Sequence, residues 1–341
     1  MHPADLLLRL YRPAPAASSI EDPAALRRTW KTWRARMFSG FFFGYAILYF
    51  CRQNLSAALE PMSVELGYSN TELGWLGTAL LVTYGIGKFL NGMLADRAHI
   101  RAFLCTALVV SGAVNLVFGS LSVLWMLALA WGMNGWFQSM GFPPIARGMT
   151  LWYPPEGKAT RWAFWTCSHQ AGTAAILGLT GAILAASWGW RACFTIPALL
   201  CIGLGVVLWF VLGDTPQAHG LPPLEAFPGR TAQGEEDDYR ATLVRCVLRN
   251  RNVWVIGLAD LFAYVVRYGA LLWVPKFLSE TRGYSAGSAA FKSAIMPLFG
   301  VAGVLLAGWV ADRVFHDRYR WVNVIAFAVL AVTLWAFQAV G

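Results

Sequence analysis

The stretch Gly92-Met93-Leu94-Ala95-Asp96-Arg97 occurs a second time, 216 residues later, as Gly308-Trp309-Val310-Ala311-Asp312-Arg313. A second pair of motifs, Tyr49-x-x-Arg52 and Tyr264-x-x-Arg267, is separated by 215 residues. Two different motifs that share nearly one period indicate the internal duplication of a long unit. Each copy lies within or beside a long apolar segment, which is typical of membrane proteins built from two homologous helical halves.

The composition around these motifs excludes an ordinary soluble globular protein. Of the 341 residues, 57% are hydrophobic and only 13% are charged, whereas about a quarter of a soluble domain is charged. The chain also contains 17 Trp and 33 Gly, and both residue types are enriched in membrane proteins. The composition therefore indicates a protein that crosses a membrane several times.

Nine apolar windows have the length that a membrane helix requires, which is about 20 residues. They cover residues 37–59, 73–95, 103–121, 123–146, 162–186, 192–212, 253–278, 287–311 and 321–340. The sequence thus predicts an all-α, multi-pass membrane protein. The basic stretch from Arg27 to Arg36 leads into the first window without a small-residue cleavage site, so we expect that helix to be retained and not removed as a signal peptide.

The spacing of the windows predicts four parts. They are an N-terminal cytoplasmic segment (1–36), a six-helix transmembrane half (37–212), a cytoplasmic linker (213–252) and the first three helices of a second half (253–341). Twenty Lys and Arg residues fall on one side of the predicted membrane and four on the other, which predicts a cytoplasmic N-terminus. Because a second half like the first would have six helices, we expect the second half to be truncated.

Several function classes lack their sequence signatures. The net charge of +9 does not indicate nucleic-acid binding, because Lys and Arg lie in short segments between apolar windows. The six cysteines form no CxxC pair, so we expect neither a disulfide framework nor a metal site. No phosphate-binding loop, HExxH or GxSxG motif occurs. We therefore expect a protein that is not an enzyme and needs no cofactor.

Three cations, Arg52, Lys88 and Arg267, fall inside apolar windows. An intramembrane cation costs on the order of 2.5–3.5 kcal/mol and indicates a functional site by default. In two facing halves Arg52 and Arg267 occupy equivalent positions beside a central cavity, and two guanidinium groups suit a phosphate or carboxylate dianion. The alternative is neutralisation by an acid, and Asp260 is a possible partner for Arg267. Lys88 lies near the end of its window, so snorkelling is the favoured interpretation.

Aromatic side chains accompany the two arginines. Tyr49 and Tyr264 precede them by three residues and therefore share their helix faces, and Tyr45 extends the first face by one turn. Each tyrosine alone could equally be a packing residue, but the repeat favours the cavity. His169, inside the fifth window, is either a structural residue or a ligand for a substrate whose charge changes with pH.

The repeated Gly92 motif predicts a conformational gate. Gly permits close helix approach, while the acid and cations can bridge helix ends in one conformation and release them in another. The alternative, a solvated charged turn, is disfavoured by the second copy. The predicted gate residues are Gly92, Asp96, Arg97, Arg101, Gly308, Asp312 and Arg313.

Several stretches resemble the major facilitator superfamily and, within it, the organophosphate:inorganic phosphate antiporter family. They are Phe43-Gly44-Tyr45 with Arg52-Gln53-Asn54, Tyr84 to Phe89, Asn134 to Pro144, Trp165-x-x-x-His169, Asp214 to Pro223 and Tyr264 to Gly269. The resemblance runs from about Trp30 to the end. It implies a major facilitator fold with a six-helix N-terminal half and a three-helix part of the C-terminal half. It also places the family's binding residues on Arg52, Arg267, His169, Lys88, Tyr45, Tyr49 and Tyr264.

Departures from the family pattern leave the identity of the substrate undetermined. Many members have Lys after the first arginine, whereas this chain has Gln53. Asp260 with Trp273-Val274-Pro275 is similar to the phosphoglycerate branch, while the stretch from Asp214 to Pro223 is similar to glycerol-3-phosphate carriers.

The resemblance implies a bacterial inner-membrane antiporter that exchanges a small organophosphate for inorganic phosphate by alternating access. Glycerol-3-phosphate, a sugar phosphate and phosphoglycerate are the candidate substrates. We expect a monomer in the lipid bilayer that binds no nucleic acid. Two alternatives stay open at this point: a membrane sensor for extracellular sugar phosphate that signals to a sensor kinase, and a non-functional truncated transporter.

Overall fold

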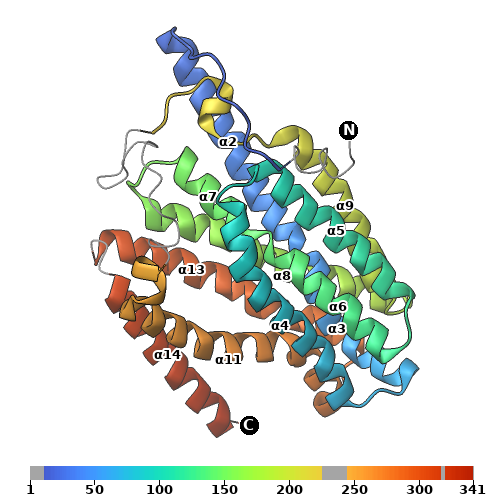
Figure 1. The fold of residues 1–341 in the computed structure, drawn as a ribbon. Coiled ribbons are helices and arrows are strands. Elements are labelled where there is room, and N and C mark those ends of the chain that lie inside the picture. Colours follow the sequence, from blue (N-terminus) through green and yellow to red (C-terminus); the bar gives the residue numbers. More distant parts are fainter. Residues whose placement is uncertain (1–10, 225–243, 316–318, 341) are drawn as a thin grey trace.

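The computed structural model describes residues 11–224, 244–315 and 319–340, and within these ranges the regular structure is helical, with no strand (Figure 1). The α-helices are α2 (Pro23–Leu48), α3 (Phe50–Leu66), α4 (Asn70–Ala95), α5 (Ile100–Ser120), α6 (Leu124–Ser139), α7 (Phe142–Trp152), α8 (Lys158–Ala185), α9 (Ala192–Val211), α11 (Arg251–Arg282), α12 (Ala286–Ser293), α13 (Ile295–Arg313) and α14 (Tyr319–Val340). Two short turns, η1 (Pro216–His219) and η2 (Val244–Leu248), lie between α9 and α11. The prediction of an all-α protein is confirmed.

Each predicted window falls on these helices, and breaks divide three of the windows into α2 and α3, α6 and α7, and α12 and α13. By length and apolar composition alone, five stretches are able to cross a membrane: Asn70–Ala95, Ile100–Ser120, Ala192–Val211, Arg251–Arg282 and Ala286–Ala311. The chain is thus a multi-pass membrane protein, while its division into six and three spans stays a prediction. Part of the predicted linker, residues 225–243, lies outside the described residues.

Local sequence sets several helix ends. Ser69 and Glu72 form a capping box at the start of α4, in which each side chain satisfies a backbone amide. Asp22 caps α2 by accepting from the amides of Ala24 and Ala25. Gly67 ends α3 with a φ of 71°, a left-handed conformation that costs glycine little. Each of these boundaries follows from residues next to it in the chain.

Helices α2 to α9 form a bundle in which α4 packs along α6 and α5 packs along α9. Phe118, Trp131 and Phe194 fill its interior with rings whose centroids lie 4.5–5.7 Å apart. All three side chains are almost completely buried. This apolar interior holds the helices that carry the predicted site in fixed relative positions.

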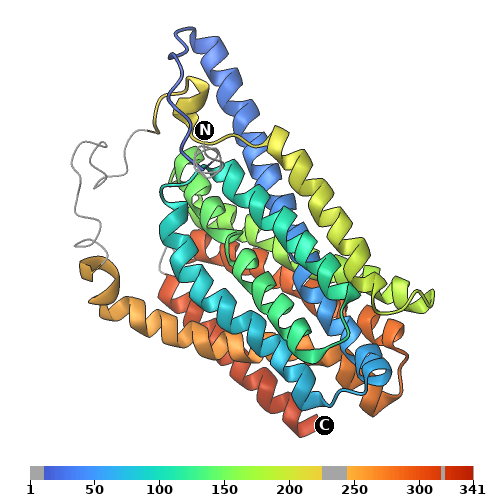
Figure 2. The same cartoon turned by 45° about the vertical axis from the view of Figure 1, so that its right-hand side comes forward.

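The helices after the linker meet this bundle along two seams. One seam runs between α3 and α11, and the other between α8 and the pair α12 and α13. The orange and red helices α11, α13 and α14 lie together on one side of the molecule in both views (Figure 1, Figure 2). At the second seam a Cβ on Gly287 would lie 2.9 Å from the Gly181 carbonyl oxygen, so the backbones of α8 and α12 come very close.

Asp214 joins several segments at the end of the bundle where α2 begins. Its carboxylate accepts from the amides of Ala14 (2.8 Å) and Ile100 (2.9 Å), and its carbonyl accepts from the indole of Trp152 (2.9 Å). Two histidines lie beside it. Burial lowers the pKa of His99 and of His219 below the usual 6.5, although Asp214 acts in the opposite direction on both.

Candidate functional site

A helix break precedes the first intramembrane arginine. Helix α2 ends at Leu48, α3 begins at Phe50, and Cys51 has the non-helical angles φ −92° and ψ 17°. Arg52 follows directly, and its side chain is only 6% exposed. The break therefore lies immediately before the residue that the sequence marks as the centre of the site.

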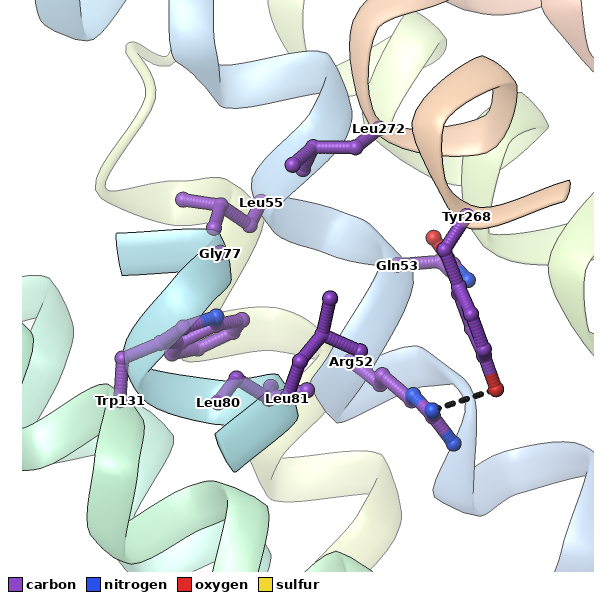
Figure 3. Close-up of a pocket in the computed structure, with 9 residues that line it drawn as sticks. All are labelled: Arg52, Gln53, Leu55, Gly77, Leu80, Leu81, Trp131, Tyr268 and Leu272. Carbon is purple, nitrogen blue, oxygen red and sulfur yellow. Dashed lines mark hydrogen bonds between the residues drawn. The ribbon is translucent and has the colours of Figure 1, made fainter. Parts of the chain in front are cut away.

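Arg52 is surrounded by tyrosines from α4, from α11 and from the break before α3. Its Nη2 donates to the hydroxyl of Tyr268 on α11 at 2.6 Å, as the dashed line in Figure 3 shows. Its guanidinium carbon lies 4.2 Å from the ring centre of Tyr84, 5.0 Å from that of Tyr268 and 5.3 Å from that of Tyr49. Among the described residues, no carboxylate lies within ion-pair distance of Arg52. In the part of the chain that the structure describes, aromatic faces and a hydroxyl thus hold this buried cation without a carboxylate partner.

A cavity of about 40 Å³ opens beside this cluster, between α3, α4, α6 and α11 (Figure 3). Its lining comprises Arg52, Gln53, Leu55, Gly77, Leu80, Leu81, Trp131, Tyr268 and Leu272. A cavity of this size has room for a few water molecules. Arg52 and the Tyr268 hydroxyl are polar groups on an otherwise largely apolar wall.

Arg267 lies on α11, one residue before Tyr268, and is partly buried. Its Nη2 is buried and has no hydrogen-bond partner among the described residues, and its guanidinium carbon lies 5.8 Å from the ring centre of Tyr264. Asp260, predicted as a possible counter-ion, is exposed two turns away and forms no ion pair with Arg267. The predicted carboxylate partner is therefore not beside this arginine.

His169 joins the same region through a short row of rings. The ring centres of Tyr45 and Tyr49 lie 5.5 Å apart, and those of Tyr49 and His169 lie 5.6 Å apart. All three side chains are less than 10% exposed. His169 is close enough to interact with the charges of both Arg52 and Arg267, and its buried Nε2 lacks a partner in the described part of the chain.

Lys88 lies at the margin of the cluster. Its Nζ is 5.5 Å from the ring centre of Tyr84 and 5.2 Å from that of Phe142, and the residue is exposed. Tyr84 therefore lies between the charges of Lys88 and Arg52. A role for Lys88 in binding stays a prediction.

The predicted gate residues are distributed over helix ends. Asp96 and Arg97 are exposed between α4 and α5, while Arg101 donates to the Trp209 carbonyl at the end of α9 (3.4 Å). Gly92 is half-buried on α4.

In the second copy of the gate motif, Gly308 packs against Ala163 of α8. Arg313 is exposed, and the side chain of Asp312 lies outside those described. Arg147 of α7, which we did not predict, donates to the Ala98 carbonyl beside the first copy (2.5 Å).

Two of the tyrosines around Arg52, Tyr84 and Tyr268, were not among the predicted site residues. Tyr84 precedes Lys88 by four residues and Tyr268 directly follows Arg267, so both stood inside motifs that the resemblance used. Their proximity to a charged residue on the same helix was the available signal. What the sequence did not provide was their distance from Arg52, which lies on a different helix.

Comparison with known proteins agrees with this architecture. The pattern of the Major Facilitator Superfamily matches residues 41–341. The chain is 36% identical to a probable hexose phosphate transport protein of Chlamydia pneumoniae, over 95% of this chain and 75% of that protein. It is 33% identical to the membrane sensor protein UhpC of Salmonella typhimurium, over 94% of this chain and 74% of that protein.

Among solved structures, the fold is similar to that of a bacterial homologue of the human lysosomal transporter Spinster, in an inward-facing and unoccupied conformation. The TM-score is 0.67 at 18% identity, over 83% of this chain and 63% of that one. This chain thus spans less than two thirds of that structure, and the likeness concerns the fold alone. The sequence matches confirm the predicted resemblance: the chain belongs to the major facilitator superfamily and, within it, to the organophosphate:inorganic phosphate antiporter family.

Proposed function

We propose that this protein carries a small organophosphate across the bacterial inner membrane in exchange for inorganic phosphate. The observation that carries the proposal is Arg52, which is buried and has no carboxylate partner among the described residues. Removing a guanidinium from water without a counter-ion is costly, on the order of 2.5–3.5 kcal/mol on membrane insertion scales. An anionic substrate offsets this cost each time it binds.

Arg52 and Arg267 suit the phosphoryl group. A guanidinium presents paired N–H donors that match two phosphate oxygens, which a lysine ammonium does not. The buried Nη2 of Arg267 and Nε2 of His169 are both without partners in the described structure, so each is open to a ligand atom. Tyr45, Tyr49 and Tyr264 are proposed to contact the ester part of the bound substrate. Phosphate moving down its gradient drives uptake, so no bound cofactor or catalytic group takes part.

Alternating access fits the two seams between the parts of the chain. Arg52 belongs to α3 and its hydroxyl partner Tyr268 to α11, so their bond crosses from the first half to the second. Movement of one half against the other would break this bond and expose Arg52 to one side of the membrane. We place the N-terminus in the cytoplasm, assign residues 37–212 and 253–341 to the two halves, and expect a monomer.

Exchange in reconstituted vesicles tests the proposal. Vesicles loaded with unlabelled phosphate should take up radiolabelled phosphate, and external glycerol-3-phosphate, glucose-6-phosphate or 3-phosphoglycerate should compete, depending on the substrate. Arg52→Lys and Arg267→Lys should each abolish exchange, because a lysine ammonium lacks the paired N–H donors of a guanidinium. Arg282→Lys is the matched control, since Arg282 is exposed at the end of the same helix as Arg267. Normal exchange in both site variants would refute the model.

The similarity to a membrane sensor protein favours one second candidate. A sensor for sugar phosphate would use the same arginines to bind its ligand and would signal to a sensor kinase without net transport. The two functions separate in one preparation: phosphate or sugar phosphate that stabilises the purified protein, without exchange in vesicles, indicates a sensor. Binding together with exchange indicates a transporter.

A further inference from the structure

The break before Arg52 changes the backbone hydrogen bonds around it. The amide of Arg52 donates to the Tyr49 carbonyl, three residues earlier, at 3.1 Å. The amide of Gln53 also donates to Tyr49, at 2.9 Å. Inside a membrane an unsatisfied carbonyl is costly, so side-chain donors from neighbouring helices stabilise the carbonyls at such a break.

Three side-chain amides supply donors at the break. Gln138 Nε2 donates to the Leu48 carbonyl at 3.0 Å. Asn134 Nδ2 and Asn115 Nδ2 both donate to the Cys51 carbonyl, at 2.7 Å and 3.1 Å. These three residues, which we call the amide clamp, are at most 2% exposed. The clamp therefore holds the carbonyls on both sides of the break, from helices α5 and α6.

Two features make α6 a firm base for the clamp. Asn134 and Gln138 are four residues apart, so they lie on one face of the helix. Between them, a Cβ on Gly135 would lie 3.0 Å from Leu80 Cα and even closer to other atoms of α4, so the two helices are in direct backbone contact. Side chains anchored on such a base have little freedom to shift.

We propose that Asn115, Asn134 and Gln138 are positioning residues that fix the break and thereby direct Arg52 toward α11. This inference rests on the proposed function, in which Arg52 binds the phosphoryl group. Neutral amides suit the task, because a carboxylate here would neutralise Arg52 and a cation would repel it. The role also accounts for Asn134 and Gln138 in the stretch from Asn134 to Pro144, which the family resemblance identified.

Phosphate affinity in a double-mutant series tests this role. The measured quantity is the phosphate Kd of the purified full chain, obtained from the rise of its unfolding midpoint with the concentration of inorganic phosphate. Gln138→Met keeps the volume of the side chain and removes the donor to Leu48. We expect it to weaken phosphate binding about tenfold or more, because small displacements of a binding group have large effects.

The matched control is Asn91→Leu. Asn91 is an equally buried amide, 2% exposed, that donates to Ser139 Oγ on α6 (2.7 Å) but does not touch the break. We expect this variant to change phosphate affinity by less than about twofold, since it removes a buried hydrogen bond between α4 and α6 without moving Arg52. Equal losses of affinity in Gln138→Met and Asn91→Leu would mean that the clamp only stabilises the fold, and would overturn the inference.

A second comparison asks whether the clamp acts through Arg52. In an Arg52→Lys background, Gln138→Met should cause little further loss of phosphate affinity, because the guanidinium that the clamp positions is absent. In an Arg267→Lys background its full effect should persist. A tenfold effect that persists beside Arg52→Lys would contradict the proposal.

The outcomes also separate this inference from the proposed function. If Arg52→Lys leaves phosphate affinity unchanged, the proposed binding site is wrong. If Arg52→Lys weakens binding but Gln138→Met does not, only the positioning role fails. Should Gln138→Met fail to yield folded protein, Asn134→Leu is the milder variant with the same expectations, because Asn115 still donates to the Cys51 carbonyl.

Discussion

Replacing Tyr268 by Phe is expected to weaken the ligand-free protein and to strengthen its binding of phosphate. Arg52 Nη2 donates to the Tyr268 hydroxyl at 2.6 Å, and Arg52 is 6% exposed. Because a hydrogen bond to a charged group contributes about 1.5–3 kcal/mol, Tyr268→Phe should lower the free energy of unfolding without ligand by about that amount. The hydroxyl no longer competes with phosphate for the Arg52 donor. Since 1.4 kcal/mol corresponds to tenfold in affinity, we expect the phosphate Kd to fall at least about tenfold.

Thermal unfolding of the purified protein over a phosphate titration measures both effects. Tyr264→Phe is the control for ligand-free stability, because Tyr264 is 39% exposed and only its ring packs on Tyr268, with centroids 5.3 Å apart. Its unfolding midpoint without phosphate should match the unmodified chain. A Tyr268→Phe protein that keeps its ligand-free midpoint and binds phosphate more weakly would refute the reasoning, since the hydroxyl would then contact the ligand itself.

Three further predictions follow from other parts of the structure. Burial lowers the pKa of His219 below 6.5, so the contribution of the neutral side chain to stability is present above pH 6.5 and is lost as the pH falls through the lowered pKa. Between pH 7 and pH 5, the unfolding midpoint of the His219→Phe variant should therefore fall less than that of the unmodified chain. Gly181→Leu should slow phosphate exchange strongly at normal expression, because its side chain would enter the backbone contact with Gly287; a wild-type exchange rate would show that this seam tolerates separation. Asp260→Asn should change the phosphate Kd by less than about twofold, since Asp260 is not paired with Arg267. A larger change would show that the Asp260 carboxylate contributes to phosphate binding.

The family and the helical architecture could be predicted from the sequence, because both depend on local or repeated features. In a bilayer every backbone polar group has to be bonded within its own helix, so apolar windows of about 20 residues predict helices directly. The recurrence of Tyr49-x-x-Arg52 and of the Gly92 motif indicated two related halves. The cost of an intramembrane cation also predicted that Arg52 and Arg267 belong to a functional site, although their roles remain predictions.

The contacts of those residues were decided only by the tertiary structure. The residues from Ala46 to Arg52 include neither Pro nor Gly, so nothing local predicts the break at Cys51. Side-chain amides from α5 and α6 donate to the carbonyls of Leu48 and Cys51 at this break. Likewise, the repeat suggested that Tyr264 would face the site, whereas Tyr268 is the residue that reaches Arg52. Periodicity specifies which face of a helix a side chain occupies, but which helix it meets depends on how distant segments pack. The position of a helix break and the residues that pair across helices are therefore determined by tertiary packing and not by the local sequence.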